Sequence, residues 1–159
     1  MRRPLLRFAL LFFAALLAFS VFSVATGLQN QLALLERAIA VAAAWVANAV
    51  GSNAVVTDNL IAVGGMTLNI NHECTGVFVL FVLVSFILAY PATWRAKLLG
   101  MGVGIVILSA VNVIRIATLV RVVESYPGAF EYFHEYVWQG AFLMLVTLYA
   151  MTWVEWARR

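Results

Sequence analysis

The chain has 159 residues, of which 65% are hydrophobic and 11% charged, with a formal net charge of +3. Soluble domains are about 45–50% apolar and about 25% charged, so this composition excludes a protein that faces water on all sides and indicates a membrane protein. The single cysteine, Cys74, excludes an intramolecular disulfide and a multi-cysteine metal cluster. The length suits one membrane domain, residues 1–159, and the small net charge does not indicate a nucleic-acid partner.

Four apolar stretches are predicted to cross the membrane as helices. The first, residues 5–25, would extend about 31 Å as a helix, which matches the thickness of a bilayer core. The others are residues 75–92, 98–120 and 134–153. A cleavable signal peptide is the alternative for the first stretch, because basic residues begin the chain. Its apolar run, however, exceeds the usual 7–15 residues of a signal peptide.

The segment between the first two spans has a different pattern. Residues 30–50 are rich in alanine, but their continuous apolar part is too short to cross a membrane, so we expect an interfacial helix. Residues 54–71 contain β-branched pairs around an Asp-Asn turn, then Gly64-Gly65 and alternating apolar and polar residues. They predict an extracytoplasmic β-hairpin with a third short strand. The expected fold is an all-α integral membrane protein with four spans, an interfacial helix and this hairpin.

The distribution of charge predicts the orientation of the chain. If the N-terminus is cytoplasmic, the inner side holds the basic residues Arg2, Arg3, Arg7, Arg95, Lys97, Arg158 and Arg159. The outer side then holds the acidic residues Glu36, Asp58, Glu73, Glu124, Glu131 and Glu135 and the basic residues Arg37, Arg115 and Arg121. Because basic residues concentrate on the cytoplasmic side of membrane proteins, we expect a multi-pass protein of the inner or plasma membrane with both termini cytoplasmic.

Three polar residues are predicted to lie at one depth, near the outer boundary of the bilayer. Cys74 begins the second span, Arg115 lies about 8 Å below the outer end of the third, and His134 begins the fourth. An arginine inside a span costs a few kcal/mol unless it pairs, reaches the headgroups or lines a wet cavity. Asn112 lies one turn before Arg115 on the same helix face, which favours a polar site over a side chain that only reaches the headgroups.

Cys74 and a histidine provide the residue types of a nucleophile and its base, since imidazole titrates near neutral pH. Cys74 stands where a polar segment enters a helix, so free N–H groups would favour a thiolate there and could bind an oxyanion, while the neighbouring Glu73 opposes that shift. Gly76 would let a substrate backbone approach closely. His134 is the expected base. His72, two residues before Cys74, is the competing candidate, and an interfacial aromatic belt is the alternative role for His134.

Three short motifs appear in order: Asn-x-x-Cys-Thr-Gly at 71–76, Asn-x-x-Arg-Ile at 112–116, and a histidine, His134, opening the last span. With them the chain resembles the exosortase/archaeosortase family of membrane transpeptidases over most of residues 66–153. The resemblance implies that Cys74, Arg115 and His134 are catalytic. The residues expected to bind substrate or support the site are Asn71, Thr75, Gly76, Asn112 and Trp138.

The resemblance also implies the reaction and its partners. The substrate would be the C-terminal sorting signal of a secreted protein, cleaved at the outer membrane interface through a thioester on Cys74 and transferred to an envelope acceptor, with membrane lipid around it and no cofactor. A non-enzymatic helical subunit or transporter component is the alternative. A zinc metalloprotease is disfavoured, because His72-Glu73-Cys74 lacks the ligand spacing of such sites.

Overall fold

The computed structural model describes residues 2–158 and, within them, every side chain except those of residues 2–4, 29 and 30. In chain order the elements are α1 (Arg2–Ala25), α2 (Leu28–Gln31), α3 (Ala33–Ala49), β1 (Val55–Thr57), β2 (Leu60–Val63), β3 (Met66–Asn69), the 3₁₀ turn η1 (His72–Thr75), α4 (Val77–Ala89), α5 (Trp94–Ser125), the 3₁₀ turn η2 (Pro127–Ala129), α6 (Phe130–Tyr132), the π-helical turn η3 (Phe133–Val137) and α7 (Trp138–Ala157). The chain is mostly helical, as predicted. Arg159 and the side chains of Arg2 and Arg3, which contribute to the predicted charge asymmetry, lie outside the described parts.

Within residues 2–158, three helical stretches are long and apolar enough to cross a membrane, namely Leu5–Ala25, Trp94–Ser125 and Pro127–Ala157. They make the chain a multi-pass membrane protein. The predicted span at residues 75–92 is shorter than expected, because α4 has only 13 residues and extends about 20 Å. Gly76, in the left-handed region, precedes α4, and Tyr90, held extended before Pro91, ends it.

The long helix α5 connects two hydrophobic cores. Its 32 residues extend about 48 Å, well beyond a 30 Å bilayer core. Near its N-terminal end α5 packs with α4 and α7 around Leu83, Ile87, Leu108 and Trp153. Gly100 and Gly104 permit this packing, since a Cβ at either position would overlap a side chain of a neighbouring helix. The Trp153 Nε1–H also donates to the Ala96 carbonyl at 3.1 Å.

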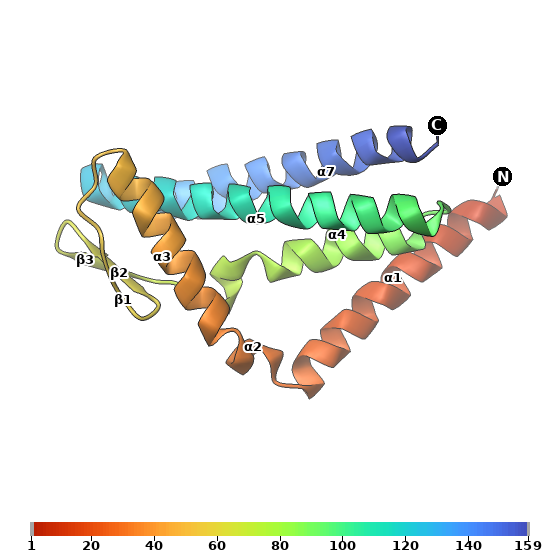
Figure 1. Ribbon diagram of the computed structural model, residues 1–159, viewed down its shortest axis with the longest axis horizontal. Helices are drawn as coiled ribbons and strands as arrows, with labels where there is room; N and C mark the ends of the chain where they lie inside the picture. Colours follow the sequence, from red (N-terminus) through yellow and green to blue (C-terminus); the bar gives the residue numbers. More distant parts are fainter. Residues whose placement is uncertain (1, 159) are drawn as a thin grey trace.

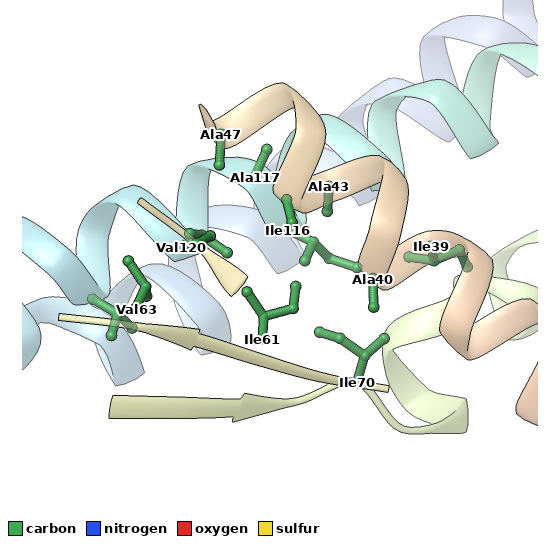
Figure 2. Close-up of a cluster of buried hydrophobic side chains, with 13 residues drawn as sticks. Ile39, Ala40, Ala43, Ala47, Ile61, Val63, Ile70, Ile116, Ala117 and Val120 are labelled. Carbon is green, nitrogen blue, oxygen red and sulfur yellow. The ribbon is translucent and has the colours of Figure 1, made fainter. Parts of the chain in front are cut away.

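The second core lies at the C-terminal end of α5, between α5, α3 and the sheet (Figure 2). It contains Ile39, Ala40, Ala43, Ala47, Ile61, Val63, Ile70, Ile116, Ala117 and Val120. The alanines lie on one face of α3 and are small enough to let this helix approach α5 and the sheet closely. The predicted helix at 30–50 is therefore present as α3, with its buried face turned to this core.

The sheet is an antiparallel meander in the order β1-β2-β3. Asp58 adopts a positive φ of 60° in the first turn, and Gly64 and Gly65 adopt φ values of 57° and 79° in the second. Two consecutive residues with positive φ form a type I′ turn, which matches the twist of a two-residue hairpin. The predicted hairpin and its third strand are confirmed.

The elements are arranged so that the two ends of the molecule differ (Figure 1). The N- and C-termini lie at one end, where α4 joins α5. The sheet and the C-terminal end of α5 lie at the other end. This arrangement places η1 and the start of the last helix, which carry Cys74 and His134, near the sheet and away from the termini.

Candidate active site

The turn that carries Cys74 is held by Asn71. The Asn71 side-chain oxygen accepts hydrogen bonds from the backbone N–H groups of Glu73 (3.1 Å) and Cys74 (3.3 Å), and its carbonyl accepts from the Cys74 N–H at 2.9 Å. The Thr75 hydroxyl donates to the His72 carbonyl at 2.6 Å and closes the turn. The sequence predicts that free backbone N–H groups here could stabilise a thiolate or bind an oxyanion. The N–H groups of Glu73 and Cys74 already donate to Asn71, so for these two groups the prediction is wrong.

Asn112 joins the cysteine turn to α5. This side chain is 1% exposed, and its Nδ2 donates to the Cys74 carbonyl at 2.8 Å. Gly76 lies against it with a φ of +72°, and a Cβ there would come within 3.3 Å of the Asn112 Cγ. The backbone conformation favours glycine at this position, and a Cβ would press against the Asn112 side chain. The four supporting residues that the sequence predicts in these two motifs, Asn71, Thr75, Gly76 and Asn112, all shape the turn that presents Cys74.

Cys74 and His134 line one cavity of about 290 Å³ between the sheet, η1 and the last helices. Its walls are Thr67, Leu68, Asn69, Ile70, Asn71, Glu73, Cys74, Ile116, Leu119, Phe130 and His134. The lining is mainly apolar with a few polar groups, as in small-molecule and peptide sites. A larger depression of about 570 Å³ lies along the outer face of α3, lined by side chains such as Leu34, Arg37 and Trp45, and contains none of the predicted catalytic residues.

His134 is positioned by a π-helical turn and an aromatic neighbour. It lies within η3, whose wider turn changes the direction of side chains relative to α7; such turns are frequent at functional sites. Its ring stacks on Phe130 at 5.5 Å between centroids and an angle of 15°. His72 does not line the cavity of Cys74 and His134 in the described chain; the hydrogen bond recorded for it uses its backbone carbonyl. Of the two histidines, His134 is therefore the one that shares a cavity with Cys74.

Arg115 lies one turn after Asn112 on α5. It is not among the described residues that line this cavity, but its charge acts on the Cys74 thiol and on His134. Its guanidinium carbon is 5.5 Å from the centre of the Phe142 ring, a cation–π contact with α7. Its Nε is buried and has no hydrogen-bond partner among the described residues. The ion pair recorded within residues 2–158 joins Arg121 to Glu124 at 2.8 Å instead. Arg115 is thus a cation held in place by an aromatic ring, with a hydrogen-bond donor still free.

The charges around Cys74 act on its thiol in opposite directions. Burial raises the pKa of the Cys74 thiol above its ordinary value, and the carboxylates of Glu73 and Glu36 raise it further. The backbone N–H of Asn71 and the charge of Arg115 lower it but do not outweigh burial. The thiol is therefore protonated at neutral pH in the resting protein, and a nucleophilic role requires a base that removes its proton.

This shift predicts the pH dependence of alkylation. The rate at which iodoacetamide modifies Cys74 should rise with pH and reach its midpoint above 8.5, the ordinary pKa of a cysteine, because the thiolate is the reacting form. Mass spectrometry reports the modification without ambiguity, since the chain has one cysteine. Glu73→Gln should lower the midpoint and Arg115→Gln should raise it. A midpoint below about 7 would contradict this account and indicate a thiolate already paired with a cation.

The structure separates Trp138 and Phe142 of α7: Phe142 contacts the Arg115 guanidinium, whereas Trp138 is not among the described residues that line the cavity. Trp138 lies one turn before Phe142, and its indole Nε1–H is buried without a hydrogen-bond partner among the described residues. Phe142, Phe130 and the strand β3 are parts of the site that sequence reasoning missed. Phe130 precedes His134 by four residues, so helical spacing was an available signal for it. Phe142 stands among apolar residues with no distinguishing pattern.

Metal binding has no support from the described residues. No group of three or more His, Cys, Asp and Glu side chains converges within residues 2–158.

Comparison with known proteins identifies the family. The family model of the transmembrane exosortases matches residues 2–153. The chain belongs to the transmembrane exosortase family. This confirms the resemblance seen in the three motifs and extends it to the N-terminal third of the chain, which the motifs did not cover.

A curated relative within this group is a probable archaeosortase E from Methanocaldococcus jannaschii. It is 26% identical to this chain over 104 residues, which cover 65% of the chain and 56% of the relative. The chain thus aligns with little more than half the length of that probable archaeosortase. No solved structure matches the chain.

Proposed function

We propose that the chain is a membrane cysteine transpeptidase that cleaves the C-terminal sorting signal of secreted proteins. The observation that carries the proposal is the cavity that Cys74 and His134 share, together with the charge of Arg115 acting on the Cys74 thiol. These three residues come from separate elements, η1, η3 and α5, and they are the types needed for nucleophile, base and electrostatic stabiliser. Membership of a family of cysteine transpeptidases supports the same chemistry.

The reaction follows from the roles of these groups. His134 takes the proton of the Cys74 thiol, and Sγ forms a bond to the carbonyl carbon of the substrate peptide. The resulting oxyanion is stabilised by the Arg115 guanidinium, an effect worth about 3 kcal/mol, or roughly a hundredfold in rate. The C–N bond then breaks and His134 returns its proton to the leaving amine, which leaves a thioester on Cys74. An acceptor amine or water, deprotonated by His134, attacks this thioester and restores the thiol.

The proposal includes four spans and an outward-facing site. The short helix α4 would be the fourth crossing, completed by its flanking residues, because it packs between α1 and α5. Both termini lie at one end of the molecule, and the sheet with the site lies at the other (Figure 1). Arg158 and Lys97 also belong to the terminal end, where Arg158 donates to the Tyr90 hydroxyl at 2.7 Å. An excess of basic residues there is typical of the cytoplasmic side.

Co-expression with a secreted protein tests this function. The protein should carry a C-terminal tail of a short motif, an apolar span and a basic cluster. We expect a shortened product outside the membrane and, in single-turnover samples, a covalent adduct on Cys74 that hydroxylamine releases, as a thioester requires. Failure to shorten any tailed protein found in the same cells would overturn the proposed substrate class, and a product that accumulates in the cytoplasm would overturn the orientation.

A further inference from the structure

The strand β3 has one free edge. In the described chain the sheet order is β1-β2-β3, so β3 pairs with β2 on one side only. The turn at Gly64-Gly65 places Val63 opposite Met66, and in a two-residue hairpin this first pair exchanges backbone hydrogen bonds. The alternation then continues to Ile70, whose N–H donates to the Asn59 carbonyl at 2.9 Å.

This register determines which backbone groups remain available. Residues 66, 68 and 70 direct their N–H and C=O groups toward β2, so those of Thr67 and Asn69 point outward from the edge. Both residues are exposed. The free edge therefore presents donors and acceptors at every second residue, a spacing that the backbone of another extended chain matches.

The cavity of Cys74 and His134 runs along this same edge. Its lining includes four consecutive residues, Thr67 to Ile70. Since neighbouring side chains of a strand point to opposite faces, a cavity that touches all four lies at the edge of the strand and not over one face. The helices also contribute to the lining, with Ile116 and Leu119 from α5 and Phe130 from α6. Cys74 lies five residues after Asn69.

We infer that the substrate segment binds as an added antiparallel or parallel strand on β3, which delivers its scissile carbonyl to Cys74. The inference rests on the proposed function. Recognition is then mainly through the peptide backbone, by hydrogen bonds to Thr67 and Asn69, as in other complexes formed by strand addition. Alternate side chains of the bound segment face Ile116, Leu119 and Phe130, so small or apolar residues suit those positions.

A peptidyl alkylating agent tests this mode of binding on the full-length chain. The probe is acetyl-Ala-Ala-Ala chloromethyl ketone, which forms a thioether with Cys74 and releases chloride; iodoacetamide is the control reagent without a peptide backbone. Thr67→Pro removes the outward N–H at the edge while the hydrogen bonds between β2 and β3 remain. Thr67→Ala is the matched variant, because it removes the side chain and keeps the N–H.

We expect Thr67→Pro to slow alkylation by the peptidyl probe about fivefold, the loss of roughly one hydrogen bond, while Thr67→Ala leaves it unchanged. Iodoacetamide should react equally with all three proteins, which also shows that the cysteine turn is intact. On the unmodified chain, single N-methyl groups at the three probe amides should slow alkylation at alternate positions only.

Two results would overturn the inference. One is a peptidyl probe that reacts equally with Thr67→Pro and the unmodified chain. The other is an N-methyl series without alternation. In either case iodoacetamide should still modify Cys74 and the tailed protein should still be shortened. Such a result would contradict binding by strand addition but not the proposed function. A chain that alkylates normally but shortens no tailed protein would instead remove the function.

Discussion

Replacing Cys74 with serine is expected to leave a tailed secreted protein at full length, with processing reduced at least about a thousandfold. The hydroxyl is a much weaker acid and a poorer nucleophile than the thiol, so a site arranged for a thiol is expected to activate it far less well. The exchange is nearly isosteric, and the hydrogen bonds that hold the turn use the Cys74 backbone N–H and carbonyl, which serine keeps. Loss of activity would therefore reflect chemistry and not folding.

The control for this variant is the amount and thermal stability of the protein in membranes, which should equal those of the unmodified chain. Immunoblotting of the tailed protein measures the processing. Normal shortening by Cys74→Ser would contradict a nucleophilic role and would favour the alternative of a non-enzymatic membrane subunit, in which Cys74 only packs against its neighbours.

The second large effect is expected at His134. His134→Ala should reduce processing about 10²- to 10⁴-fold, the range that general acid–base catalysis contributes. The raised pKa of the Cys74 thiol makes this dependence strong, because few thiolates form at neutral pH without a base. The stacking partner Phe130 stays in place in this variant, so the cavity keeps its aromatic wall.

His72→Ala is the matched control, since the two histidines differ in position and not in chemistry. Processing should stay within about twofold of normal, because His72 lies outside the lining of the cavity and its recorded hydrogen bond uses the backbone. The opposite pattern, with His72 essential and His134 dispensable, would show that the base is the histidine next to the cysteine. Initial rates at several pH values separate a lost base from a lost binding contact.

Much of the fold was predictable because its signals are local. Hydropathy located the apolar helices, and Gly64-Gly65 with the alternation after it located the hairpin and third strand. The exception is α4, whose ends depend on the conformations of Gly76 and Tyr90. Hydropathy alone extends the predicted span to residues 75–92, because it does not register these backbone constraints.

The candidate site was predictable as a set of residues but not as a geometry. The motifs selected Cys74, Arg115 and His134 by their order and depth. They did not predict that Phe142 lies under the guanidinium, that a π-helical turn carries His134, or that the edge of β3 borders the cavity. Each of these depends on how two elements far apart in the chain meet.

By itself the sequence determined a membrane protein of this family, its main helices and strands, and the three residues of the proposed chemistry. Only the tertiary structure decided that Asn112 binds the carbonyl of Cys74, 38 residues away, and that burial raises the pKa of the Cys74 thiol. The physical reason is that hydropathy and turn preference act over a few neighbouring residues, whereas burial, hydrogen bonding and charge coupling depend on the packing of distant segments.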